Sequence, residues 1–299
     1  DGDSTEGTAG EEETDGDPVG GENTDKTVPD GSEDGAAADG MLSGELSGDS
    51  APEDTMSLER MPDRDTDGMG VTYETVGYYA YNIYANGQPL LIVASENVNY
   101  AKLYVDSNRN GIGEAGEEIT SFQGDGTLDG TGIYYSESMG GYYLANSGIY
   151  GGAKEGTCQY DTCVTLAGSS HELDAANPAY TVWAIYGGNA GGTLTGSTDV
   201  TISGGNIKYI SGGNGGGTLN GDAHIDISGG NAEYVWGGGY SGHVDGNTHI
   251  RVTGGCVSNG IYGGLSNGTI SGNTSIHIEN AQVKSVYGGN EYSGMVGGN

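Results

Sequence analysis

A repeat of about 25 residues, a length within the usual range for repeat architectures, fills the C-terminal part of this chain. Each copy carries an aliphatic residue, then in most copies an aromatic one, then two glycines. The copies begin at Ile185, Ile210, Val235, Ile261 and Val286, and the spacing is constant except for one extra residue before Ile261. A fixed period of this size is typical of stacked structural units rather than of a closed globule.

Apolar and polar residues alternate inside each repeat, as in Val200-Thr201-Ile202. Alternation is the period of a strand with one buried face, and no window of the repeats carries the spacing of an amphipathic helix. Gly-Gly, Gly-Asn and Asn-Gly pairs separate the strands and predict corners, because both residues tolerate positive φ. We therefore predict an all-β fold, a parallel β-solenoid with three short strands and about 25 residues in each coil.

In-register coils place like residues on like residues. We expect Asn189, Asn214 and Asn290 to form part of an amide ladder at one corner. Two irregularities interrupt the period. The copy at 149–152 lies further from Ile185 than one period, which predicts an inserted loop over residues 167–181, of the kind that often decorates a binding face. The extra residue between Val257 and Ile261 predicts a bulge.

The regions before the repeats differ in composition. Residues 1–69 hold 22 Asp and Glu against three basic residues, a net of −19, and no aromatic residue. Such a segment cannot bury enough apolar surface to offset its ordering, and we predict a disordered acidic linker. Residues 70–148 are expected to form a β-rich cap on the first coil of the repeats at 149–299. Within the cap, an Asn86-Gly87 turn between the strands at 71–84 and 90–94 predicts a hairpin.

Charge and cysteine content restrict the partners. A net charge of −33 argues against nucleic acid. Three cysteines are too few for a disulfide framework. Cys158 and Cys163 are close enough in sequence to form a disulfide, although we expect the side chain of Cys158 to point inward and that of Cys163 to point outward. No apolar stretch suggests a membrane span. Because the sequence starts at Asp1 and stops inside a repeat, we expect any signal peptide to be removed or to lie outside it, and the array to be longer.

The sharpest local motif spans residues 106–117 and has the spacing of a calcium loop. Oxygen-bearing side chains stand at positions 1, 3 and 5, a glycine at 6 and a glutamate at 12. The expected ligands are Asp106, Asn108, Asn110, the carbonyl of Ile112, and Glu114 or Glu117. The loop resembles the strand-led calcium loops of secreted bacterial proteins. That resemblance implies a structural calcium ion, and the alternative is a polar turn without metal.

A column of aromatic residues follows the inward aliphatic residue of the repeats and is expected to point outward. It consists of Tyr150, Tyr186, Trp236, Tyr262 and Tyr287, interrupted at Ser211. Ring faces repeated along a solenoid match the stacking platforms of carbohydrate-binding surfaces. The alternative is that neighbouring rings stack on one another and stiffen the coils.

Polar residues share a second outward face. The register predicts that His224, Asp226, His249, Arg251 and His277 are neighbours there. Carboxylate, imidazole and guanidinium groups together can perform acid–base chemistry or bind a metal. A solvated sheet face also carries such residues without any activity. His224, Asp226, His249 and Arg251 are nevertheless the candidate catalytic residues if the protein is an enzyme.

The repeats at 185–205, 210–230 and 235–255 resemble the glycine-rich "YGG" repeats of large surface proteins in Gram-positive gut bacteria. At the level of the fold they are similar to the right-handed parallel β-helix of the pectate-lyase-like superfamily. The resemblance implies a secreted or cell-surface protein that acts as an adhesin or structural stalk and binds a glycan or host-surface ligand. The alternative is a polysaccharide lyase or glycoside hydrolase, which the scarcity of basic residues and of paired carboxylates disfavours.

Overall fold

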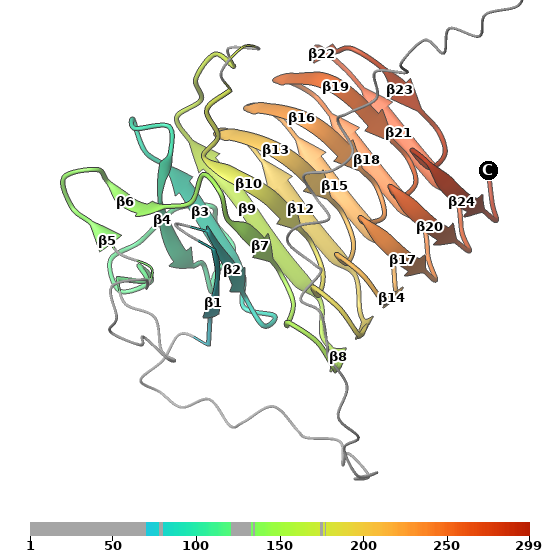
Figure 1. Cartoon of the computed structure of the whole chain (residues 1–299), viewed down its shortest axis with the longest axis horizontal. Helices are drawn as coiled ribbons and strands as arrows, with labels where there is room; N and C mark the ends of the chain where they lie inside the picture. The colour runs from blue at the N-terminus through green and yellow to red at the C-terminus, as the bar shows by residue number, and fades with distance from the viewer. Residues whose placement is uncertain (1–69, 78–79, 121–132, 134, 174–175, 177) are drawn as a thin grey trace, which may run out of the picture. The chain divides into compact units, whose positions relative to one another are not determined.

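The computed structural model describes residues 70–77, 80–120, 133, 135–173, 176 and 178–299, all within the compact unit Asp54–Asn299. The linker expected over residues 1–69 lies outside them. The described residues form strands and turns, and none of them belongs to a helix that could cross a membrane. Stacked parallel strands make a β-solenoid (Figure 1), as the repeat predicts.

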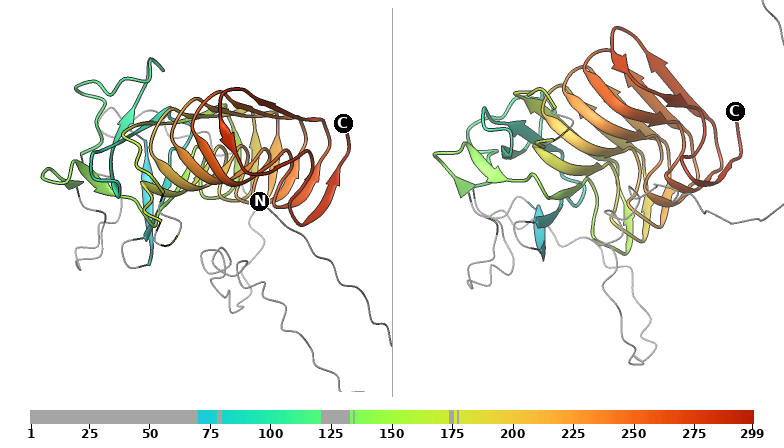
Figure 2. Two further views of the ribbon diagram at one scale, coloured as in Figure 1. Left: turned by 90° about the horizontal axis from the view of Figure 1, so that it is seen from above. Right: turned by 45° about the horizontal axis from the view of Figure 1, so that its top comes forward.

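Each coil of the solenoid contributes one strand to each of three sheets, and successive coils lie side by side (Figure 2). The first regular coil consists of β10 (Val182–Tyr186), β11 (Thr193–Thr195) and β12 (Thr198–Ile202). The next coils are β13 (Asn206–Ser211), β14 (Thr218–Asn220) and β15 (Ala223–Ile227); β16 (Asn231–Trp236), β17 (Ser241–Val244) and β18 (Thr248–Val252); and β19 (Cys256–Tyr262), β20 (Asn267–Ile270) and β21 (Thr274–Ile278). They are preceded by β7 (Gly148–Tyr150), β8 (Thr157–Gln159) and β9 (Thr162–Gly168), and followed by β22 (Gln282–Val283), β23 (Val286–Tyr287) and β24 (Ser293–Val296).

The coils pair in parallel and in register, so the repeat positions of the sequence become vertical columns. Ile185 lies beside Ile210, and Ile210 beside Val235. These side chains are fully buried, as are the inward residues of β12, β15 and β18. Removing such aliphatic ladders from water is the main favourable contribution to the fold. The extra residue of β19 produces a register shift between β16 and β19, which confirms the predicted bulge.

Two sets of polar side chains form hydrogen bonds between neighbouring coils. At one corner, Oδ1 of Asn214 accepts a hydrogen bond from the backbone N–H of Asn189 at 2.9 Å, and Oδ1 of Asn290 accepts one from Leu265 at 2.9 Å. The three asparagines thus share the predicted corner, but their amides bond to backbone rather than to one another, and Gly239 and Leu265 separate Asn290 from Asn214 in the column. These bonds satisfy corner N–H groups that the fold buries.

The second set is made of threonine hydroxyls at the start of the third strand of each coil. Thr198 Oγ1 donates to the carbonyl of Gly212 in the next coil at 2.6 Å. The same bond is made by Thr162 to Gly187, by Thr248 to Gly263 and by Thr274 to Gly288. Ala223 occupies this position in β15 and leaves the carbonyl of Gly237 without such a donor.

The cap covers the first coil, but it does not contain the predicted hairpin. Its strands are β1 (Thr72–Gly77), β2 (Ala80–Tyr84), β3 (Leu90–Ala94), β4 (Tyr100–Val105), β5 (Tyr135–Ser136) and β6 (Gly141–Tyr143). β2 pairs in parallel with β7, whereas β3 pairs in parallel with β9, so the two strands belong to different sheets. The Asn86-Gly87 turn, with φ of 53° and 81°, is therefore a solenoid corner. Antiparallel β1 and β4 end the parallel stacking on this side.

The predicted insertion lies between β9, which ends at Gly168, and β10, which begins at Val182, and residues 174–175 and 177 lie outside the described residues. The three cysteines are free. Cys158 packs against the inward residues of β11, as expected from the repeat. Cys163 lies in the outward column of the third sheet, beside Asp199. The two thiols face opposite sides of the solenoid wall, which accounts for the absence of a bridge.

Candidate functional site

The loop after β4 is a tight turn organised by the side chain of Asp106. Asp106 is almost fully buried and accepts hydrogen bonds from the backbone N–H groups of Asn110 at 3.1 Å and Gly111 at 2.8 Å. Asn110 Oδ1 accepts one from Ile112 at 2.8 Å. Arg109 and Gly111 both adopt positive φ, which makes the turn tight enough for alternate side chains to converge.

Both glutamates of this loop turn back toward it. Glu114 accepts hydrogen bonds from the side-chain amides of Asn110 at 3.0 Å and Asn108 at 3.5 Å. Glu117 Oε1 accepts a bond from the backbone of Ser107 at 3.3 Å, and its Oε2 is shielded from water without a hydrogen-bond partner. A buried carboxylate oxygen without a donor is costly unless a cation satisfies it. The residues present therefore fit a calcium ion.

The aromatic column forms stacks rather than an open platform. The rings of Tyr150 and Tyr186 lie 4.7 Å apart and nearly parallel, and Tyr84 of the cap extends the stack at 5.4 Å. Tyr262 and Tyr287 stack at 4.9 Å. The rings occupy one another's faces, which is the arrangement the alternative interpretation predicts.

Burial also removes two of the five residues of this column from solvent. Tyr150 and Trp236 are 5% and 4% exposed, and burial raises the pKa of the Tyr186 hydroxyl well above its usual value. Trp236 Nε1 donates to Glu291 Oε2 at 2.9 Å. Only Tyr287, in the last coil, is half exposed. Tyr150 and Trp236 therefore do not present free ring faces to solvent, whereas Tyr186, Tyr262 and Tyr287 keep some exposure and sugar binding by them stays a prediction.

The polar face has the predicted register. Asp199, His224 and His249 are direct neighbours in one column of the third sheet, and Asp226 and Arg251 in the column two residues further along. Arg251 forms an ion pair with Asp226 at 3.1 Å. His277 is placed beside Arg251 but pairs with Glu279 at 3.1 Å.

Two carboxylates of this face lie beside basic side chains. Glycoside hydrolysis uses two carboxylates on either side of one bond. On the described face Asp226 is neutralised by Arg251, and Asp199 lies 3.6 Å from His224 Nδ1. The candidate catalytic residues are therefore neighbours, with Asp226 paired to Arg251, while Asp199 lies near His224 without a hydrogen bond to it.

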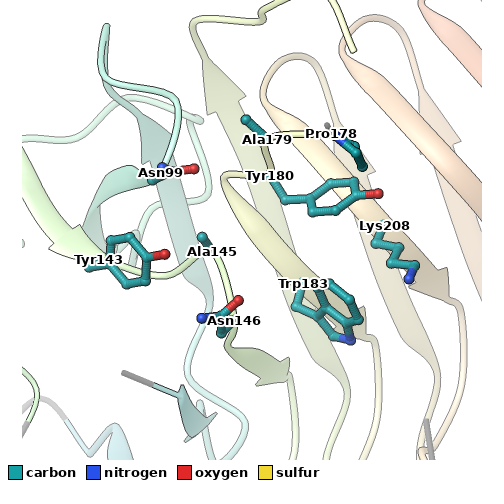
Figure 3. Close-up of a pocket in the computed structure, with 9 residues that line it drawn as sticks. All are labelled: Asn99, Tyr143, Ala145, Asn146, Pro178, Ala179, Tyr180, Trp183 and Lys208. Carbon is teal, nitrogen blue, oxygen red and sulfur yellow. The ribbon is translucent and has the colours of Figure 1, made fainter. Parts of the chain in front are cut away.

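A pocket lies where the cap, the inserted loop and the first regular coils meet (Figure 3). Its volume is about 380 Å³, within the usual range for small-ligand sites. Its lining residues are Asn99, Tyr143, Ala145, Asn146, Pro178, Ala179, Tyr180, Trp183 and Lys208. We call it the Trp183 pocket.

The Trp183 pocket combines partly exposed rings with polar groups. Trp183 and Lys208 lie on one side of it in Figure 3, and Tyr143 and Asn146 on the other. Lys208 Nζ lies 4.2 Å from the centre of the Trp183 ring, a cation–π contact that fixes both side chains. Tyr180 packs edge-on against Trp183 with ring centres 5.6 Å apart, and its hydroxyl is bonded to Glu233.

Sequence reasoning missed Trp183, Lys208 and Tyr143 as site residues. Trp183 and Lys208 are in register, because β10 pairs Val182 with Ile207. The available signal was the insertion, which was expected to decorate a binding face and does supply Pro178 and Tyr180. Tyr143 comes from the cap, and the sequence gives no register between the cap and the coils.

The chain matches no known protein-family profile, no curated protein and no solved structure.

Proposed function

We propose that this protein is a secreted or cell-surface β-solenoid that binds carbohydrate in the Trp183 pocket, as an adhesin or a ligand-bearing stalk. The observation that carries the proposal is the partly exposed indole of Trp183 inside a pocket that also holds amides and an ammonium group. Sugars present apolar C–H faces and rings of hydroxyls, so they are recognised by aromatic faces together with hydrogen-bonding groups.

The roles of the lining residues follow from their chemistry. Trp183 and Tyr143 offer aromatic surface for the faces of a sugar ring. The side-chain amides of Asn99 and Asn146 can donate to and accept from hydroxyl groups. Lys208 can donate to a hydroxyl or to the carboxylate of an acidic sugar. The Trp183 indole is held by Lys208 and Tyr180 before any ligand binds, which reduces the entropy lost on binding.

The calcium loop belongs to the same proposal as a stabilising element. Its side chains are two amides and three carboxylates, Asp106, Glu114 and Glu117. Such a mixed set suits the millimolar calcium of extracellular media. The loop follows β4, whose strand pairs with β3 and β6 in the cap. A bound ion would therefore hold the cap that supplies Asn99 and Tyr143 to the pocket.

The proposal is tested by retention of the full chain on immobilised neutral and uronic-acid polysaccharides, with calcium present. We expect wild type to be retained by at least one polysaccharide. Trp183→Ala should remove at least about 1 kcal/mol of binding, several-fold in affinity, because it deletes the stacking surface. The matched control is Tyr287→Ala, which removes a half-exposed ring outside the pocket and should bind as wild type does.

Three results would contradict the proposal. They are failure of wild type to bind any of the panel, normal binding by Trp183→Ala, and loss of binding in Tyr287→Ala while Trp183→Ala keeps it. The last result would instead assign recognition to the end of the aromatic column. Release of sugar products in the same samples would revive the enzyme alternative.

A further inference from the structure

We propose that Asp222, His224 and His249 form a binding site for a divalent transition-metal ion of the zinc type on the outer face of the third sheet. One potential ligand atom from each residue lies within 4.8 Å of those of the other two. The three side chains are partly exposed. This site is separate from both the calcium loop and the Trp183 pocket.

The three ligands are brought together by closeness in sequence and by the in-register pairing of neighbouring coils. Asp222 lies in the corner directly before β15 and His224 near the start of that strand, and the corner brings the carboxylate of Asp222 close to the His224 imidazole. His249 is the in-register partner of His224 on β18. The two imidazole rings lie 5.1 Å apart and nearly parallel. The stacking of one coil on the next thus converts two histidines that are distant in sequence into adjacent ligands.

The carboxylate of Asp222 is held in the orientation that a ligand needs. Its Oδ1 accepts hydrogen bonds from the backbone N–H of Asn247 at 2.7 Å and from the Asn247 side chain at 3.0 Å. These bonds, the backbone one foremost, lower the pKa of Asp222 and keep it ionised. Among the described residues, no hydrogen bond engages Oδ2, which remains available to a metal. Outer hydrogen bonds of this kind commonly orient metal ligands.

Two further observations concern His224. Its Nδ1 is shielded from water and has no hydrogen-bond partner, although such buried nitrogens normally have one. Asp199 Oδ1 lies 3.6 Å from that nitrogen, on the strand on the other side from His249. Asp199 is therefore placed to orient this ring and to add negative charge beside a cation. The nearby guanidinium of Arg251 is paired with Asp226, which limits its repulsion of a metal ion.

The donor set selects the class of metal. Two imidazoles and one carboxylate favour zinc, copper or nickel over calcium and magnesium, which prefer oxygen ligands. Ligand atoms around a tetrahedral zinc ion are roughly 3.4 Å apart. The ligand atoms of Asp222, His224 and His249 lie within 4.8 Å of one another, and rotation of these partly exposed side chains can bring them to the shorter separation that zinc requires. Three protein ligands leave a fourth position for water or for a donor group of a partner.

The test is calorimetric titration of the full chain with zinc, in excess calcium so that oxygen-only sites are filled. We expect one strong equivalent in wild type. Affinity should fall at least about tenfold in His224→Ala, His249→Ala and Asp222→Asn. His277→Ala is the matched control, since His277 is on the same face but pairs with Glu279, and it should bind as wild type does. Thermal unfolding in calcium alone shows whether each variant is folded.

Cobalt provides an independent readout of the same site. We expect visible absorption of tetrahedral cobalt in wild type and in His277→Ala, and its loss in His224→Ala and His249→Ala. The proposal is overturned if wild type retains no zinc, or if zinc binds with unchanged affinity after both histidines are replaced. In either case the two rings only stack on one another.

Discussion

Replacing Gly187 by alanine should destabilise the solenoid, because the first glycine of each repeat lies against the same glycine of the next coil. A Cβ added at Gly187 would lie 2.0 Å from the carbonyl oxygen of Gly212, a backbone atom that cannot swing away. Ordinary contacts of this kind begin at 3.4 Å, so the two coils would have to move apart locally. The close approach repeats at Gly151, Gly212 and Gly237.

The expected loss of folding free energy can be worked out from the hydrogen bonds that this separation of the coils would break. Coils lie about 4.8 Å apart, so a local separation of more than an ångström is too large for the hydrogen bonds between them. The backbone bonds of Gly187 to Ser211, at 2.9 Å, and of Gly188 to Gly213, at 3.0 Å, are the nearest. Overpacking costs about 1–3 kcal/mol, and each lost bond about 0.5–1.5 kcal/mol. Alanine recovers at most about 1 kcal/mol by restricting the unfolded chain. We expect a net loss of about 1–5 kcal/mol.

The assay is thermal unfolding followed by circular dichroism, with Gly288→Ala as the matched control. Gly288 is the same repeat position in the last coil, where a Cβ meets nothing within 4 Å. For a folded unit of this size, 1 kcal/mol corresponds to about 2–4 °C. Gly187→Ala should therefore lower the melting temperature by at least about 2 °C, whereas Gly288→Ala should leave it unchanged or slightly higher. Equal melting temperatures for the two variants would refute the steric explanation of the repeated glycine.

Three further predictions concern hydrogen bonds, pH and calcium. In Ala223→Thr the new hydroxyl should donate a hydrogen bond to the carbonyl of Gly237 and raise the free energy of unfolding, measured with urea, by about 1 kcal/mol. Ala223→Val lacks the hydroxyl and should gain less stability. An equal gain in the two variants would argue against the hydrogen bond. Burial raises the pKa of Glu291 above 4.5, so the folded state loses stability as pH rises above 4.5 through that raised pKa. Glu291→Gln should therefore raise the melting temperature more at pH 7 than at pH 4, and an equal change at both would contradict this. Chelation of calcium should lower the melting temperature of the wild type. The corresponding loss of folding free energy is about 2.7 kcal/mol if calcium was present at 100 times its Kd. Chelation should have little effect on Glu117→Gln, and a response that is absent in the wild type, or equal in the two proteins, would count against the calcium loop.

The repeat made the solenoid predictable because period and register are carried by the sequence itself. Once coils stack at a fixed period, Ile185 must lie beside Ile210, and His224 beside His249. The bulge near Val257 and the asparagine corners follow from the same alignment. The cap has no repeat, so its strand pairing had no such guide. The Asn86-Gly87 turn was therefore assigned to a hairpin, although it joins two sheets.

Exposure was harder to predict than register. Alternation correctly separates the inward aliphatic residues from the aromatic column, but it does not show what covers an outward side chain. The glycine-rich corners leave space that the rings occupy: a Cβ at Gly215 would lie 3.1 Å from the ring of Tyr150. The Trp183 pocket depends on the cap and the insertion, which lie outside the repeat. Asp222 was missed because it occupies a corner, where alternation no longer assigns a side.

The most direct test of the proposed function uses Trp183 as its own reporter. The chain contains two tryptophans, so Trp236→Phe leaves Trp183 as the single indole. Fluorescence of this variant would be titrated with an oligosaccharide of whichever polysaccharide retains the protein, with acrylamide quenching measured at each end point. We predict a change in emission and protection from the quencher as the sugar covers the ring. Retention of the sugar with unchanged emission and unchanged quenching would contradict the claim that the Trp183 pocket is the binding site.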